Sequence, residues 1–145
     1  MILIKPWEHA YDLAYLIRRA VFILEQGVPE ELELDELDPS ALHALAYQDG
    51  QCVGTGRLVN LGNRQAQIGR MAVLQNFRGQ GIGREILERL LLTATAEGAS
   101  SLILHAQLTA MPFYEKLGFV GQGSIYEEAG IPHRNMMLLL PNPIS

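Results

Sequence analysis

The most informative stretch of the sequence is residues 70–84, Arg70-Met71-Ala72-Val73-Leu74-Gln75-Asn76-Phe77-Arg78-Gly79-Gln80-Gly81-Ile82-Gly83-Arg84. Its first residues are typical of a strand, and the residues that follow its last glycine have the apolar spacing of a helix. The glycines between them allow the backbone to curl, with successive N–H groups pointing inward. The helix N-terminus adds the positive end of its dipole. The stretch therefore predicts a phosphate-binding turn, with Arg78 and Arg84 as flanking cations.

Two common phosphate-binding turns fit this stretch poorly. A Walker loop needs Lys-Ser or Lys-Thr after its last glycine, whereas Gly83 is followed by Arg84-Glu85. A dinucleotide fingerprint needs G-x-G-x-x-G and an acid about 20 residues later, whereas here the spacing is G-x-G-x-G and no acid lies between Gly98 and His105. The remaining pattern is R-x-x-G-x-G. The alternative that these glycines only shape a tight turn stays open.

Hydrophobic spacing on both sides of this turn predicts a mixed sheet covered by helices. Strands are expected over residues 2–4, 43–47, 52–59, 65–74, 102–104, 119–126 and 133–140, and helices over residues 13–24, 82–94 and 110–117. In the first helix, Arg18 and Arg19 are expected on the side away from the core. Asp49-Gly50 predicts a hairpin turn, and Gly54 and Gly56 predict a bulge or a close backbone approach. This order of elements is typical of an α/β or α+β fold.

Length and composition favour one soluble domain over residues 1–145. The single cysteine excludes an internal disulfide framework and a Cys-rich zinc site. No apolar run approaches the roughly 18 residues of a membrane span, and the N-terminus lacks a signal-peptide layout. We therefore expect a cytoplasmic protein that binds no membrane and no metal.

Charge is divided unevenly along the chain. The net charge of −5 disfavours nucleic acid as a partner. Seven of the 16 acidic residues lie in residues 25–38, which contain no basic residue, whereas residues 50–84 contain five arginines and no acid. The sequence therefore predicts a basic half suited to phosphate and a separate acidic stretch suited to a cationic ligand.

The R-x-x-G-x-G turn resembles the pyrophosphate loop of the GNAT N-acetyltransferase superfamily, and the order of elements matches that fold over nearly the whole chain. Further similarity lies in Met71-Ala72-Val73 and in Phe113-Tyr114-Glu115-Lys116-Leu117-Gly118-Phe119. The chain is most similar to the small bacterial ElaA/YjcF-like branch, through Glu25-Gln26-Gly27-Val28-Pro29, His105-Ala106-Gln107 and Gly130-Ile131-Pro132-His133. The resemblance implies a mixed, mostly antiparallel sheet of six to seven strands, splayed between strands 4 and 5, with three to four helices.

The resemblance also implies acetyl-CoA as cosubstrate and assigns the residues that hold it. The pyrophosphate is expected on the loop residues Arg78, Gly79, Gln80, Gly81, Ile82, Gly83 and Arg84. The pantetheine arm is expected along Met71, Ala72 and Val73, like an added strand, and a backbone N–H near Val73 would stabilise the oxyanion. His105 and Gln107, at the end of the strand that flanks the splay, are further expected cofactor contacts.

For the chemistry, the resemblance assigns Tyr114 as the general acid that protonates the departing thiolate, although an aromatic that only packs a helix onto the sheet is the alternative. His133 is the preferred general base because histidine titrates near neutral pH, and Glu25, Glu33, Asp35 and Glu128 are the other candidates.

On the acceptor side, Glu25, Gln26, Glu33 and Asp35 are expected to face a small-molecule or peptide amine. The expected activity is direct transfer of an acetyl group to a primary amine within a ternary complex. The competing function is an acyl-CoA-binding sensor with little turnover. GNAT dimers are common, and a homodimer interface is expected, if one forms, along the late strands, residues 125–140.

Overall fold

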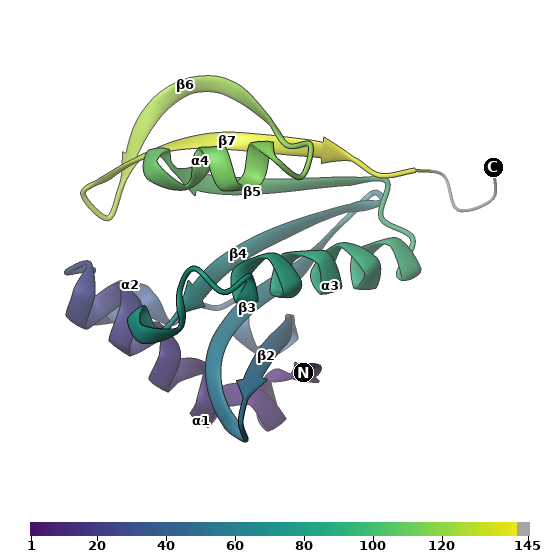
Figure 1. Ribbon diagram of the computed structural model, residues 1–145. Helices are drawn as coiled ribbons and strands as arrows, with labels where there is room; N and C mark the ends of the chain where they lie inside the picture. Colours follow the sequence, from purple (N-terminus) through teal and green to yellow (C-terminus); the bar gives the residue numbers. More distant parts are fainter. Residues whose placement is uncertain (142–145) are drawn as a thin grey trace.

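Seven strands form one mixed sheet in the computed structural model, which describes residues 1–141 (Figure 1). The spatial order is β1-β2-β3-β4-β5-β7-β6. The strands are β1 (Ile2–Pro6), β2 (Leu42–Gln48), β3 (Gln51–Gly62), β4 (Gln65–Val73), β5 (Ser101–Gln107), β6 (Val120–Glu128) and β7 (Ile131–Leu139). Each expected strand is present, and most are longer at one or both ends than the sequence predicted.

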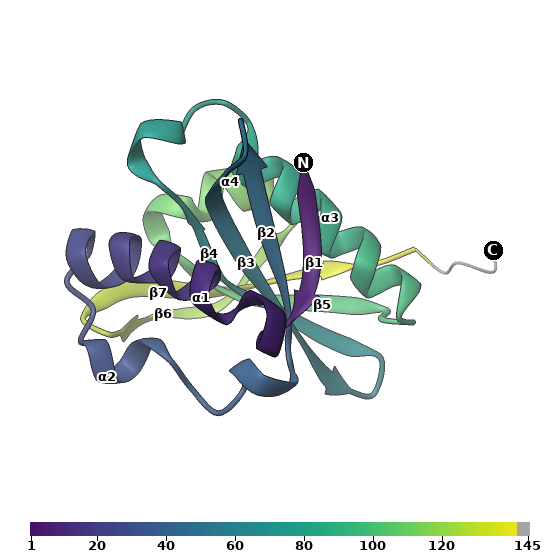
Figure 2. The same ribbon diagram turned by 90° about the horizontal axis from the view of Figure 1, so that it is seen from below.

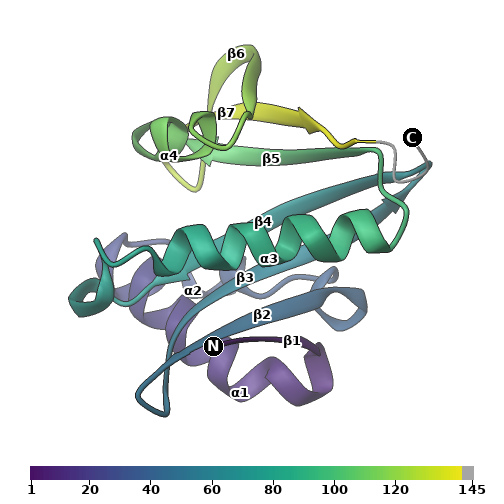
Figure 3. The same ribbon diagram turned by 45° about the vertical axis from the view of Figure 1, so that its right-hand side comes forward.

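All neighbouring strands are antiparallel except β4 and β5, which are parallel. These two strands pair only along their first residues, Gln65–Ile68 with Ser101–Leu104, and then diverge. Figures 1 and 3 show the resulting V, with β5, β6 and β7 on one arm and β1 to β4 on the other. The predicted mixed sheet with a splay between strands 4 and 5 is confirmed.

The helices are α1 (Trp7–Arg18), which continues as a π-helical segment (Arg19–Glu25), α2 (Glu30–Glu33), α3 (Ile82–Ala96) and α4 (Met111–Glu115). Of these, α1 and α3 cover opposite faces of the β1–β4 arm, whereas α4 lies beside β5 and β7 (Figure 1). Side chains alternate along β2, so Leu45 packs with α1 while Ala44 and Ala46 join the core under α3. Figure 2 shows α1 in front of the strands and α3 behind them.

Two glycines of β3 let α3 lie directly on the sheet. A Cβ at Gly56 would stand 2.7 Å from Met71 Sδ and 2.9 Å from Ile86 Cγ2. A Cβ at Gly54 would stand 2.9 Å from Ile86 Cδ1. These distances confirm the close approach expected from the sequence. The expected hairpin at Asp49-Gly50 is also present, with φ of 51° and 80° as a type I′ turn requires.

The prediction for the outer side of the first helix is confirmed for Arg19, which is exposed, and wrong for Arg18, which is only 1% exposed. Leu16 and Leu24 are instead more than 60% exposed. The helix starts earlier than expected, at Trp7, so Ala10 and Ala14 share its buried stripe with Ile17 and Arg18. Arg18 can be buried because carboxylates lie around it, as described below.

Candidate active site

A bulge in β4 accompanies the splay. Between the pairs Thr55–Ala72 and Arg57–Gly69, β4 carries one residue more than β3. Arg70, inside this bulge, has a φ of 51°, a left-handed conformation unusual for a residue with a side chain. The bulge follows Ile68, the last β4 residue that pairs with β5. We attribute the divergence of the two strands to this local bend.

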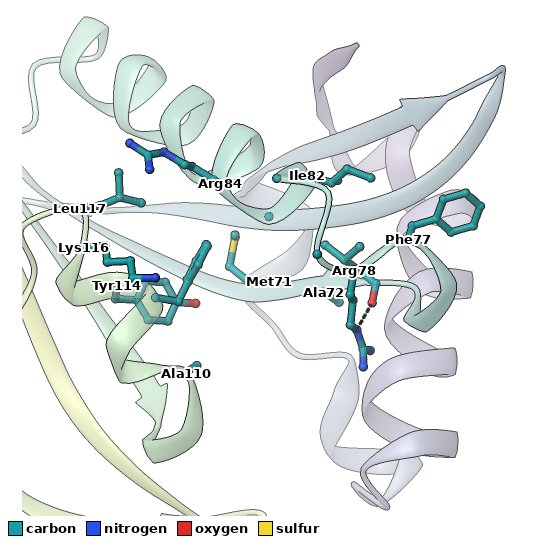
Figure 4. Close-up of a pocket in the computed structure, with 15 residues that line it drawn as sticks. Met71, Ala72, Phe77, Arg78, Ile82, Arg84, Ala110, Tyr114, Lys116 and Leu117 are labelled. Carbon is teal, nitrogen blue, oxygen red and sulfur yellow. Dashed lines mark hydrogen bonds between the residues drawn. The ribbon is translucent and has the colours of Figure 1, made fainter.

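Two cavities open on either side of the splayed end of β4. The first, here called the donor cavity, has a volume of about 600 Å³ (Figure 4). It is lined by Met71, Ala72, Val73, Phe77, Arg78, Gly79, Gly81, Ile82, Gly83, Arg84, Ala110, Phe113, Tyr114, Lys116 and Leu117. The expected cofactor residues of the 71–84 stretch, Gln80 excepted, therefore lie around one space.

The glycine turn presents unbonded backbone amides to the donor cavity. Gly79 and Gly81 have φ of 79° and 84°, and Gly81 precedes the first turn of α3. Within the described residues, the amides of residues 79–84 donate no hydrogen bond, and no side chain caps α3. Consecutive free amides at a helix N-terminus favour an anionic group such as phosphate.

The two expected flanking cations are each paired with a carboxylate. Arg78 donates from both terminal nitrogens to Glu25, at 2.7 Å each, and from Nε to the Val73 carbonyl at 2.9 Å. Figure 4 shows its guanidinium directed away from the glycine turn. Arg84 donates to Glu88, one helical turn away, at 2.7 Å. Glu25, expected on the acceptor side, therefore contacts the donor loop instead.

Tyr114 is the residue of α4 that both cavities share. Its ring is packed between Phe113 and Phe119, with centroids 5.1 and 5.8 Å away, and the residue is 8% exposed. Burial raises the pKa of its phenol to about 12, and no hydrogen bond to it is found within residues 1–141. The hydroxyl points from α4 toward β4 (Figure 4). At neutral pH this phenol is protonated and able to donate.

The second cavity, here called the acceptor cavity, has a volume of about 620 Å³. It shares Met71, Ala72, Val73, Arg78, Ala110 and Tyr114 with the donor cavity. Other walls come from the π-helical segment, the acidic stretch, β5 and the β6–β7 hairpin. At its mouth, Gln107 Nε2 donates to Gln26 Oε1 at 2.8 Å, so one expected cofactor residue contacts one expected acceptor residue.

Part of the acidic stretch is neutralised inside the protein. Arg18 donates to Glu33 Oε1 at 2.6 Å and to Asp38 Oδ1 at 2.8 Å, and the three residues are 1–2% exposed. Burial raises the pKa of Glu33, against the opposing effect of Arg18. Burial also acts to raise the pKa of Asp38, but hydrogen bonds from Arg18 and the Asp35 amide outweigh it and lower that pKa to about 2.

Two arginines of the basic half complete this buried network. Arg57 donates to Asp35 at 2.7 Å and to Asp38 at 3.1 Å. Arg70 donates to Asp35 at 3.3 Å and to the carbonyls of residues 32 and 33. The division into a phosphate-binding basic half and an acidic ligand-binding stretch is therefore wrong for these residues, because the two groups neutralise one another.

The sequence analysis missed this network because its members are far apart in the chain. His43 belongs to it as well: its Nε2 lies 3.1 Å from the Asp38 carbonyl, and its ring packs on Trp7. Burial lowers the pKa of His43. The one signal in the sequence that could have indicated the network was the position of Arg18, directly after the buried Ile17 in the first helix.

The two candidate histidines and the candidate Glu128 lie together in the acceptor cavity. His105 Nδ1 is 3.3 Å from Glu128 Oε1, and His133 Nε2 is 3.7 Å from Glu128 Oε2. His133 Nδ1 lies 2.6 Å from the Ile131 carbonyl, to which it donates. Among residues 1–141, no set of three or more His, Cys, Asp or Glu is arranged to hold a metal ion.

A family model for the acetyltransferase (GNAT) domain matches residues 9–140. This chain belongs to the GNAT family. YjcF of Bacillus subtilis, named as an uncharacterised N-acetyltransferase, is 39% identical over 94% of this chain and 96% of its own.

Solved GNAT structures agree with this assignment. An acyl-CoA N-acyltransferase from Pseudomonas aeruginosa superposes with a TM-score of 0.83 and 31% identity, covering 94% of this chain and 97% of that one. Escherichia coli ElaA gives a TM-score of 0.83 with 28% identity, covering 94% and 98%. The resemblance to this GNAT branch is thus confirmed.

No helix within residues 1–141 is long and apolar enough to cross a membrane.

Proposed function

We propose that this GNAT protein transfers an acetyl group from acetyl-CoA to a primary amine by direct attack within a ternary complex. The observation that carries the proposal is the meeting of the two cavities at Tyr114 and the splayed end of β4. One cavity has the free amides that a pyrophosphate needs, and the other has titratable side chains. A thioester held at their junction would be reachable by an amine from the acceptor side.

On the donor side, the amides of residues 79–84 would hold the pyrophosphate and the edge of β4 at Met71–Val73 would hold the pantetheine arm. A β4 amide near Val73 would stabilise the oxyanion formed during attack. Bound acetyl-CoA supplies the activated acetyl group. Tyr114 keeps its proton until a thiolate departs, because burial raises its pKa to about 12.

The test measures thiol release from acetyl-CoA across a panel of primary amines, with acetyl-CoA affinity measured separately by calorimetry. Amine-dependent thiol release with formation of the N-acetyl product supports the proposal. Tight binding of acetyl-CoA without release above background for any amine would favour an acyl-CoA sensor instead.

Replacing Tyr114 by Phe should lower kcat about 100-fold while leaving the acetyl-CoA Kd within about twofold, because general acid catalysis contributes roughly that much. The melting temperature should change little, since the hydroxyl has no partner within residues 1–141. The matched control is Tyr11→Phe, an exposed tyrosine on α1. Unchanged turnover in Tyr114→Phe would remove the residue from the mechanism and leave it a packing role.

A further inference from the structure

The acceptor cavity contains one carboxylate that no arginine neutralises. Three carboxylates line it, Glu33, Asp35 and Glu128. The first two are bonded to arginines of the buried network. Glu128 is 47% exposed at its side chain, and within the described chain the ring nitrogens of two imidazoles lie 3.3 and 3.7 Å from its carboxylate oxygens. The negative charge open to an amine therefore lies on the β6–β7 hairpin, not on the acidic stretch.

Glu128 faces two imidazoles from the neighbouring strands β5 and β7. His105 on β5 faces one carboxylate oxygen and His133 on β7 faces the other. Because His133 donates from Nδ1 to the Ile131 carbonyl, its Nε2 is the nitrogen that faces the carboxylate.

Tyr126 fixes the two imidazoles. Its ring stacks on His133 at a centroid distance of 6.0 Å and meets His105 edge-on at 6.1 Å. Its hydroxyl donates to Asn135 Oδ1 at 2.5 Å, which ties the ring to β7. Tyr126 therefore packs beside both imidazoles that face Glu128.

The other residues that line the acceptor cavity indicate what kind of group the acceptor amine carries. Apolar side chains line the cavity on the side of the π-helical segment, the acidic stretch and the hairpin, namely Val21, Phe22, Val28, Leu32, Leu37 and Ile131. A second ammonium group would meet carboxylates already bonded to Arg57 and Arg70. The cavity therefore suits one positive charge attached to an apolar group.

From these observations we infer that Glu128 binds the acceptor ammonium and removes its proton, and that the acceptor is a primary amine with a single positive charge on an apolar body. His105 and His133 are positioning residues. The inference rests on the proposed acetyltransferase function.

The proposed transfer conserves atoms, electron pairs and charge. Glu128 accepts one proton from the ammonium, and the freed lone pair attacks the thioester carbonyl carbon. The C–N bond forms and the C–S bond breaks, with the electron pair leaving on sulfur, which takes the Tyr114 proton. The second nitrogen proton restores the phenol, and Glu128 releases its proton to solvent. The products are the N-acetyl amine, the free thiol of coenzyme A and one proton.

The experiment compares kcat and KM for phenethylamine and spermidine, with acetyl-CoA as donor, in the wild type and in Glu128→Gln. We expect the wild type to prefer phenethylamine by at least about tenfold in kcat/KM. Glu128→Gln should lose about 100-fold in kcat/KM for the amine, the scale of general base catalysis, with the acetyl-CoA Kd within about twofold. Glu127→Gln, an exposed neighbour outside the cavity lining, is the matched control and should equal the wild type.

His105→Asn tests the positioning role. It should lower kcat for the amine about tenfold without changing the acetyl-CoA Kd. A rise in the Kd for acetyl-CoA with unchanged amine kinetics would overturn this role and make His105 a cofactor contact.

The possible results distinguish a failure of the Glu128 inference from a failure of the proposed acetyltransferase function. A wild type that acetylates amines while Glu128→Gln is equally active overturns the inference alone, as does a preference for spermidine. An equal loss in the double variant Glu31→Gln/Glu36→Gln also overturns it, because these exposed acids would then carry the recognition. A wild type that binds acetyl-CoA but acetylates no amine overturns the proposed function and the inference together.

Discussion

Arg78 shows how much a single partner changes what a residue can do. The sequence predicts a free cation beside the phosphate turn, and the structure shows a bidentate pair with Glu25, whose pKa this hydrogen bond lowers. The pair is partly exposed, with side chains 39% and 35% accessible. Exposed ion pairs contribute at most about 1 kcal/mol. A pyrophosphate can therefore compete with Glu25 for the guanidinium.

Glu25→Gln should strengthen acetyl-CoA binding by a few fold, because the variant releases Arg78 toward the phosphates. Its melting temperature should stay close to that of the wild type, in keeping with the small value of an exposed pair. Calorimetric titration with acetyl-CoA measures the effect. Glu36→Gln makes the same charge change on an exposed residue of the acidic stretch and is the control. Weaker binding in Glu25→Gln would show that the pair holds the loop in its binding conformation.

For single residues, the sequence predicted which side chains lie together around the donor cavity better than which lie together around the acceptor cavity. Residues 71–84 are contiguous, and a strand, a tight turn and a helix keep such residues close in any fold. The Glu128 site joins residues of β5, β6 and β7. Which of their side chains meet depends on the register between these strands, and the sequence did not reveal that register. The partners of Glu33 and Asp35 lie 15 to 37 positions away, so their neutralisation could not be predicted either.

At the scale of elements, backbone geometry does more than side-chain type to form the site. The bulge at Arg70 bends β4 away from β5, and the positive φ of Gly81 starts α3 with its amides free. The order of elements along the chain and the close approach at Gly54 and Gly56 were predictable because hydrophobic period and glycine spacing are local signals, whereas the splay between β4 and β5 was expected only from the GNAT resemblance. The burial of Arg18 was not predictable, since its carboxylate partners Glu33 and Asp38 lie 15 and 20 residues further along the chain.

Gly81→Ala should cost about 1 kcal/mol of folding free energy, because a φ of 84° strains a residue with a Cβ. The strained turn should also weaken acetyl-CoA binding several-fold. Gly98→Ala is the matched control: its φ is 90°, no atom lies within 4 Å of the added Cβ, and it follows the other end of α3. Urea unfolding should show similar losses in both variants, and calorimetry should show weaker binding only in Gly81→Ala. Equal affinity in the two would remove the loop from cofactor binding.

At the scale of the whole molecule, the buried network connects the helical layer to the sheet. Arg18 comes from α1, Arg57 from β3 and Arg70 from β4, and all three converge on residues 33–38 of the acidic stretch, at the end of α2 and just after it. Arg57 Nε is the one buried side-chain polar atom within residues 1–141 that lacks a partner. Breaking such a network by removing one member is costly, because a buried charge is left uncompensated.

The network should make stability depend on pH through Asp38. Its folded pKa of about 2 is below the ordinary value of 3.8, so its stabilising effect is complete above about pH 4 and is lost as the pH falls toward 2. The lost free energy is about 2 kcal/mol by linkage. In urea unfolding, Asp38→Asn should have a lower free energy of unfolding than the wild type at pH 7. This difference in free energy should shrink by about 2 kcal/mol at low pH. Asp12→Asn, on the exposed side of α1, should keep a constant difference.

The β6–β7 hairpin combines a core strand with an exposed tip. Its tip, at a tight turn with φ of 52° and 76° at Ala129-Gly130, borders the acceptor cavity, whereas β7 pairs with β5 and buries Met136 in the core. For protein engineering, the tip of this hairpin is therefore the segment to vary when the proposed acceptor specificity is to be changed, because the residues around the glycine turn lie elsewhere. Changes in β7 or in the acidic stretch would first damage stability.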